Sequence, residues 1–193
     1  GHQWTVTLGG QTVASSTTSE ADGGGSTNFT FTPPDNGIYI VALTVTDLDH
    51  GDQQYVDEGR LVVDNVAPHS LTIGGVAANP KEGESLPLSA NFVDPGTSDR
   101  FTYAWRVTRG GVEQAAQSAS NVAVVPDFPF TPNDQGTYVV TLVVADDDGG
   151  SATTSRTIQV AANAPTASFS GLPVSPVEGT EVALIGTISE PGT

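Results

Sequence analysis

The side chains of this chain that could do chemistry are mainly carboxylates, and they gather in short turns. Carboxylate oxygens without a basic partner are the ligands that a hard cation such as calcium needs. No helical pattern flanks these turns, so an EF-hand is excluded. The sequence therefore predicts a calcium site built on turns. Its candidate ligands are Asp47, Asp49, Asp64, Asp94, Asp99, Asp146 and Asp148.

The same turns also have a simpler interpretation. The run 146–150, Asp-Asp-Asp-Gly-Gly, is a good hairpin turn whose carboxylates can all face water. A similar turn follows Asp47 earlier in the chain, which adds support to the cation hypothesis. Both interpretations remain open from the residues alone.

Catalytic chemistry has little support in the sequence. His2, His50 and His69 fall near one end, in a turn and in a linker, and none of them recurs elsewhere in the chain. Neither Gly-x-Ser-x-Gly nor His-Glu-x-x-His occurs, and the chain has no cysteine to serve as a nucleophile or zinc ligand. We therefore expect a protein that is not an enzyme.

Composition narrows the class of protein further. Among 193 residues, 22 are acidic and 6 are Lys or Arg, for a formal charge of -16. That balance excludes a nucleic-acid-binding surface, because nothing would neutralise phosphates, and no apolar run is long enough for membrane insertion. The 22 Gly and 13 Pro suit many turns between short strands, so an all-β fold is predicted. Strong acidity without cysteine favours a secreted or cell-surface location.

The sequence repeats itself at a period of about a hundred residues, the size of one small domain. The repeat shares a Trp strand, an Asp-x-Gly-x-Tyr turn, an acidic turn and an Ala-Pro linker. Matched positions are Trp4 and Trp105, Tyr39 and Tyr138, Asp47 and Asp146, Ala67-Pro68 and Ala164-Pro165, Glu82-Gly83 and Glu178-Gly179, and Asp94-Pro95-Gly96-Thr97 and Glu190-Pro191-Gly192-Thr193.

The repeat boundaries do not coincide with the two ends of the given sequence. If Ala-Pro begins a domain, residues 67–163 hold one complete repeat. Residues 1–66 then hold the later strands, C to G, of a preceding repeat, and residues 164–193 hold the first strands, A and B, of a following one. The first and last parts are complementary, since each has the strands that the other lacks.

Strands of the complete repeat are predicted from alternation of apolar and polar residues at period two. Turn signals rich in Gly, Asp and Pro separate the alternating segments, and no helical periodicity competes with them. The predicted inward faces are Leu86, Leu88, Ala90 and Phe92; Tyr103, Trp105 and Val107; and Tyr138, Val140, Leu142 and Val144.

A lone Trp on an early strand, followed by a Tyr that closes the E–F corner, is typical of an immunoglobulin-type sandwich. Together with Glu82-Gly83, the Asp94–Asp99 turn and the run 146–152, these residues resemble the PKD (polycystic-kidney-disease) type of immunoglobulin-like domain. That family occurs in tandem on microbial secreted and surface proteins. The expected fold is therefore a series of tandem antiparallel β-sandwiches. The turn after Trp105 departs from the family pattern, which makes this a divergent relative.

In such a sandwich the B–C and F–G loops lie at the end where the chain enters. Asp94 and Asp99 should thus approach Asp146, Asp148 and the linker residue Asp64. Calcium bound there would stiffen the junction between domains.

The sequence thus predicts a structural module of a stalk or fibre, with self-association as the main partner interaction. The alternative is an accessory module of a secreted hydrolase or adhesin that binds polysaccharide or a cell-surface protein. A carbohydrate-binding face needs a row of exposed aromatic side chains, and both Trp residues are assigned to cores. The complementary first and last parts further predict head-to-tail association, in which the tail of one copy completes the head of the next. A longer continuous chain of repeats would make the same contact through covalent connection.

Overall fold

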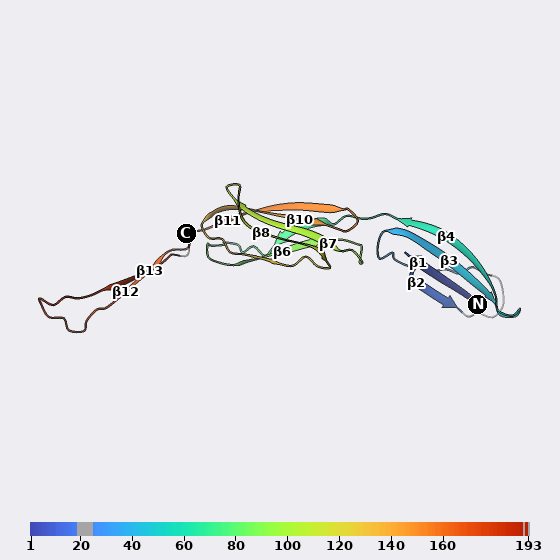
Figure 1. Ribbon diagram of the computed structural model, residues 1–193, viewed down its shortest axis with the longest axis horizontal. Coiled ribbons are helices and arrows are strands. Elements are labelled where there is room, and N and C mark those ends of the chain that lie inside the picture. The colour runs from blue at the N-terminus through green and yellow to red at the C-terminus, as the bar shows by residue number, and fades with distance from the viewer. Residues whose placement is uncertain (19–24, 191, 193) are drawn as a thin grey trace.

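The computed structural model describes residues 1–18, 25–190 and 192 of the chain. Pro191 and Thr193, which belong to the last matched segment, lie outside the described residues. The fold is all-β and antiparallel, as predicted, and the described residues contain no helix. A first sheet, a central sandwich and a terminal hairpin follow one another along the long axis (Figure 1).

The central sandwich consists of seven strands in two sheets. One sheet has the order β5-β6-β9 and the other β11-β10-β7-β8, which correspond to strands A, B, E and G, F, C, C′ of an immunoglobulin-like domain. Its strands are β5 (His69–Gly74), β6 (Leu86–Val93), β7 (Phe101–Arg109), β8 (Val112–Val122), β9 (Phe128–Phe130), β10 (Gly136–Ala145) and β11 (Ser151–Val160).

Alternating residues of the two sheets meet in one hydrophobic core. Trp105 is at its centre with 1% of its surface exposed, and its ring packs against Phe128 at 5.9 Å between centroids. Tyr138 closes the E–F corner, because its hydroxyl donates to the carbonyl of Asp134 at 2.8 Å. The rest of the core comes from Ile73, Leu86, Leu88, Phe101, Tyr103, Val107, Val125, Phe130, Val140, Leu142, Val144, Ile158 and Val160.

In its described residues, the first part of the chain repeats only one of these sheets. Its four strands have the order β2-β1-β3-β4, and β3 pairs with both β1 and β4 as β10 pairs with β7 and β11. Tyr39 forms the same corner, with its hydroxyl 2.6 Å from the carbonyl of Asp35. The strands are β1 (His2–Leu8), β2 (Gln11–Thr18), β3 (Gly37–Asp47) and β4 (Gln53–Val63).

This first sheet is covered only in part. Phe29 and Phe31 lie over it, with Phe29 stacked on Trp4 at 6.2 Å and Phe31 against Tyr39 at 5.8 Å between centroids. These phenylalanines correspond to Phe128 and Phe130 of β9, yet residues 28–31 form no strand, since no second-sheet strand pairs with them among the described residues.

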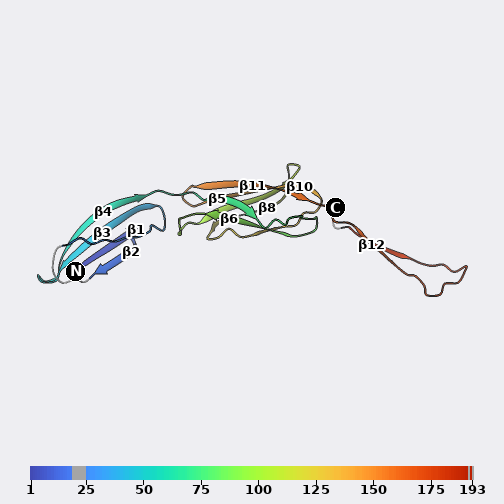
Figure 2. The same ribbon diagram turned by 180° about the vertical axis from the view of Figure 1, so that it is seen from behind.

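The last part of the chain is a two-stranded hairpin. Strand β12 (Thr166–Ser170) pairs with β13 (Ile185–Ser189) and with no other strand that the structure describes. The hairpin extends away from the central sandwich, on the side opposite the first sheet (Figure 2). All ten of its strand residues are exposed, Ile188 by 78%.

Candidate metal centre

The acidic turns converge at the entry end of the central sandwich, which we define as the end where the linker 64–68 reaches it. The loop 94–100 connects β6 to β7, and the loop 146–150 connects β10 to β11. Asp94, Asp99 and Asp146 each place one carboxylate oxygen within 4.8 Å of the others. A calcium ion with oxygen ligands at roughly 2.4 Å spans about that distance between opposite ligands.

Asp146 holds this end of the domain together. Its Oδ1 accepts hydrogen bonds from the backbone N–H groups of Asp148 at 3.1 Å and Gly150 at 2.6 Å. Its Oδ2 accepts from the side-chain amide of linker residue Asn65 at 2.9 Å. Asp146 thus fixes the loop and the linker, and its oxygens already have partners.

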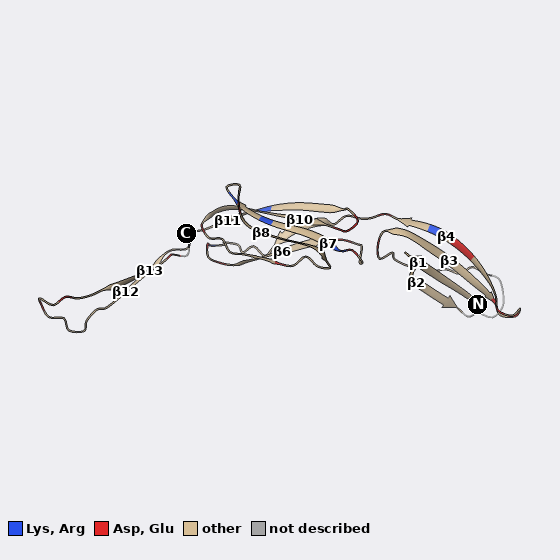
Figure 3. Cartoon of the chain, in the orientation of Figure 1, with Lys and Arg blue, Asp and Glu red and all other residues tan. Residues whose placement is uncertain are grey.

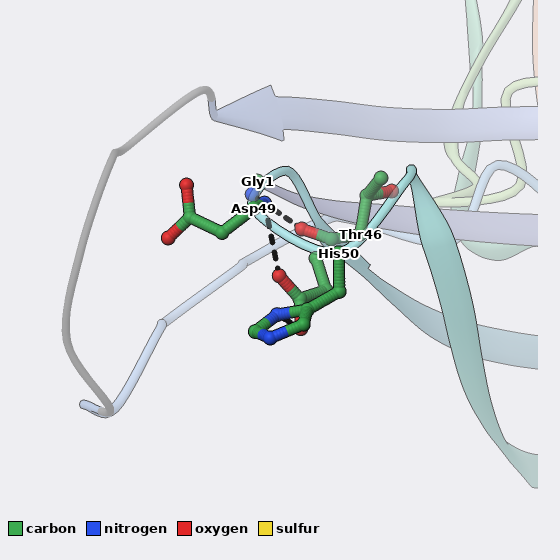
Figure 4. A network of polar contacts seen from close by, with 5 residues as sticks. Gly1, Thr46, Asp49 and His50 are labelled. Carbon is green, nitrogen blue, oxygen red and sulfur yellow. Dashed lines mark hydrogen bonds and ion pairs between the residues drawn. The ribbon is translucent and has the colours of Figure 1, made fainter.

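The first sheet contains the same turn at its corresponding end. The N–H of Asp49 donates to Oδ1 of Asp47 at 3.1 Å, and the ring of His50 lies 3.1 Å from the other oxygen of Asp47 (Figure 4). Gly1 and Thr46 exchange backbone hydrogen bonds beside it. In this copy a histidine therefore replaces the linker amide as the second partner of the turn aspartate.

The carboxylate of Asp99 differs from that of Asp146 in its hydrogen bonding. Only 7% of its surface is exposed, and neither of its carboxylate oxygens has a hydrogen-bond partner. Oδ2 of Asp94 is also buried without a partner, although Oδ1 accepts from the N–H of Gly96 at 3.0 Å. Burial, followed by the charge of Asp94, raises the pKa of Asp99 to about 7. A buried carboxylate without a donor is costly, and a cation is one way to compensate it.

The first repeat also contributes residues to the entry end of the central sandwich. The carbonyl of Pro34 accepts from the backbone N–H of Ser98 at 3.1 Å, so the E–F corner of the first repeat contacts the loop 94–100. The next residue, Asp35, forms a second group with Asp99 and Asp148, again with one oxygen of each within 4.8 Å of the others. None of the ion pairs among the described residues involves any of these acidic side chains.

The structure thus brings together four of the seven predicted ligands, Asp94, Asp99, Asp146 and Asp148. Asp64 is exposed in the linker and belongs to neither acidic group. Asp47 and Asp49 lie in the corresponding turn of the first repeat, outside both groups among the described residues.

Sequence reasoning missed Asp35. The signal that could have found it is a difference between the repeats. The equivalent residue, Asp134, pairs with Arg109 at 2.7 Å, whereas the residue at the position of Arg109 in the first repeat is Leu8. Asp35 therefore lacks the arginine that neutralises its counterpart.

Comparison with known proteins agrees with this architecture. The sequence model of the PKD domain matches residues 73–160, which span the strands from the end of β5 to β11. A search of curated proteins finds no match to the chain. PKD domains are non-catalytic modules that occur in extracellular proteins. Within the described residues, no helix is long and apolar enough to cross a membrane. The family match and the two-sheet core together identify residues 73–160 as a PKD-type immunoglobulin-like domain.

Proposed function

We propose that this chain is a non-catalytic structural segment of an array of PKD-type repeats, a stalk or fibre in a secreted or cell-surface protein. In this array, consecutive repeats are docked end to end, and strands of the same repeat type supply the second sheet that the described residues of the first part do not form. The match to the PKD domain supports an extracellular structural or adhesive module.

The observation that carries the proposal is a difference in burial between equivalent residues of one chain. Leu142 and Val144 on β10 are completely buried beneath β5, β6 and β9. Their counterparts on β3 are Leu43, which is partly exposed, and Val45, which is 43% exposed. The first sheet thus has a partly exposed apolar face at the positions that strands β5 and β6 cover in the central sandwich.

The terminal hairpin is such a strand pair. Leu88 on β6 is fully buried in the central core, while its counterpart in the last repeat, Leu184, is 58% exposed. The same holds for Leu86, which is 2% exposed, and its counterpart Val182, which is 42% exposed. In the central sandwich, Leu86 and Leu88 also pair with Phe130 and Phe128 of β9.

We assign the apolar face of the first sheet to the hairpin of a second copy. By the register of the central sandwich, Val182 and Leu184 of one copy would pair with Phe31 and Phe29 of the next. This contact uses different surfaces on the two copies, so it continues into a chain of copies and does not close into a dimer. Strand addition at an open edge supplies the backbone hydrogen bonds.

The polysaccharide-binding alternative has weaker support. Among the described aromatic residues, only Tyr55 on β4 and Phe169 on β12 are mostly exposed, at 66% and 65%. They belong to different parts of the chain and form no row along which sugar rings could stack.

The test is sedimentation velocity of the whole chain over a range of concentrations. We expect species larger than the monomer whose share grows with concentration. Leu184→Asp should abolish them, because it places a charge on the face that enters the apolar core of the neighbour. The matched control is Thr187→Asp, since the equivalent residue of β6, Asn91, is exposed.

A wild-type chain that remains monomeric at the highest concentration would contradict the head-to-tail contact. Equal loss of association in Leu184→Asp and Thr187→Asp would also contradict it, because the effect would then be one of added charge and not of the buried face.

A further inference from the structure

The acidic group at the entry end includes a residue from each side of a repeat junction. Asp35 belongs to the turn before β3, in the first repeat, whereas Asp99 and Asp148 belong to loops of the central sandwich. The contact between Pro34 and Ser98 holds these two repeats together at this point. The group is thus a property of the junction and not of one domain.

Asp99 links the two acidic groups. It belongs both to the group with Asp35 and Asp148 and to the group with Asp94 and Asp146. With 93% of its surface buried and both oxygens unpartnered, its side chain points into the junction without a donor to receive it. Gly96 leaves room for it, because a Cβ there would clash with both carboxylate oxygens of Asp99.

At the second junction, between the central sandwich and the terminal hairpin, a buried carboxylate comes from the earlier of the two repeats. Glu82, in the turn between β5 and β6, is 3% exposed, and its Oε1 accepts from the N–H of linker residue Asn163 at 2.7 Å. Its Oε2 lies against Gly192, where a Cβ would be only 2.6 Å away. Gly192 is the counterpart of Gly96 in the matched segments.

Equivalent glycines at the two junctions thus each have a carboxylate against them. At the first junction it comes from Asp99 of the later repeat, and at the second from Glu82 of the earlier repeat. If every junction is alike, a glutamate of one repeat and an aspartate of the next converge on the same point. Two buried carboxylates at one point repel each other strongly unless a cation lies between them.

We propose that the junction between consecutive repeats binds one divalent cation of the calcium type through carboxylates of both repeats. Asp94, Asp99 and Asp148 serve from the later repeat and Asp35 from the earlier one, and Glu82 has the corresponding role of an earlier-repeat ligand at the next junction. Hard oxygen ligands of this kind suit calcium, which accepts irregular geometry, better than magnesium, which demands an octahedron. The inference rests on the proposed function only in requiring that consecutive repeats be docked.

The test is titration of the whole metal-free chain with calcium chloride, followed by calorimetry and thermal unfolding. We expect one bound calcium per chain and a rise in the melting temperature of the central sandwich, with a weaker response to magnesium chloride. Asp99→Asn should lower calcium affinity by about tenfold or more, because it removes a charged ligand. Asp35→Asn should also lower it, although Asp35 lies outside the central sandwich.

The control for loss of one negative charge is Glu58→Gln. Glu58 is exposed on β4, next to Asp57 in the acidic segment of that strand (Figure 3), and belongs to neither acidic group. Its substitution should leave calcium binding unchanged. Gly96→Ala gives a second probe, because it should displace the carboxylate of Asp99 without removing it and lower calcium affinity as well.

Two results would overturn the proposal. A wild-type chain that neither binds calcium nor gains stability from it would rule out a cation at the junction. Calcium affinity unchanged in Asp35→Asn would show a site within one domain and not at the junction. Head-to-tail association is measured separately, in chelator and with Leu184→Asp, so its failure is distinguishable from the failure of the cation site.

Discussion

The two tryptophans allow a comparison, within one chain, of how much a second sheet contributes to stability. Trp105 is enclosed between two sheets, while Trp4, at the same place in the first repeat, is only partly buried. We expect Trp105→Ala to destabilise the central sandwich by about 3–5 kcal/mol. Trp4→Ala should cost clearly less, because its ring already contacts solvent on one side. Chemical denaturation followed by far-ultraviolet circular dichroism would measure both, and equal costs would contradict the difference in enclosure.

The indole nitrogen of Trp105 allows a finer prediction. It is buried without a hydrogen-bond partner, so the ring's position is determined by packing alone. Trp105→Phe removes an unsatisfied N–H together with part of the ring, and these two effects oppose each other. We therefore expect a loss of stability well below that of Trp105→Ala in the same denaturation experiment. A loss as large as that of the alanine variant would show that the indole nitrogen has a partner.

At the residue scale, sequence alone identified the carboxylates but not the roles of individual ones. Asp146 is one of the predicted ligands and belongs to one acidic group, and its oxygens also accept hydrogen bonds from backbone N–H groups and from Asn65. Asp35 was assigned only to a turn, because its approach to Asp99 depends on how two repeats dock, which no local pattern encodes. The Tyr39 and Tyr138 corners were predictable, since their geometry is local to five residues.

The linker and the loop 146–150 are packed tightly enough for a single methyl group to matter. A Cβ on Gly150 would clash with Oδ2 of Asp146 and would lie 2.6 Å from the Cβ of Ala67. We expect Gly150→Ala to lower the melting temperature and to speed amide exchange in the linker 64–68. Gly59→Ala on β4 is the control, because its Cβ meets nothing within 4 Å. Equal effects of the two substitutions would show that the loop does not hold the linker.

Period-two alternation predicted the strands that face the core, and the structure confirms the all-β class and the antiparallel sandwich. It was least informative for β8, whose sequence is mostly polar and whose residues are mostly exposed. That strand forms because it pairs with β7 along nearly its whole length, not because it covers the core. Residues 28–31 illustrate the converse, because the Phe pattern of β9 is present but the described residues supply no strand to pair with it.

At the scale of the whole molecule, a net charge of -16 opposes close docking of acidic ends. The first junction concentrates this repulsion, since Asp35, Asp99 and Asp148 meet there without a cationic side chain among the described ion pairs. The second junction differs, because Arg109 neutralises Asp134 and the described part of the last repeat is a hairpin without the later loops. The two junctions should therefore respond differently to calcium.

Distances measured across each junction would reveal this difference. The chain has no cysteine, so pairs of introduced cysteines can be spin-labelled without competition. Exposed strand positions suit this purpose: Thr12 on β2 with Ser118 on β8 spans the first junction, and Ser118 with Ser168 on β12 spans the second. Leu184→Asp in the background keeps copies apart. We expect calcium to narrow the distance distribution of the first pair and to leave that of the second unchanged, because among the described residues only the first junction brings carboxylates of both repeats into one acidic group.

Asp35→Asn gives the decisive comparison in the same experiment. This substitution leaves the loops of the central sandwich intact but removes the carboxylate that the earlier repeat contributes. Calcium should then no longer narrow the distribution between Thr12 and Ser118. If narrowing persists in this variant, calcium acts within the central sandwich and the stiffness of the array comes from the short linker alone. If both pairs narrow equally in the wild-type chain, the cation acts by screening the overall charge and not by bridging one junction.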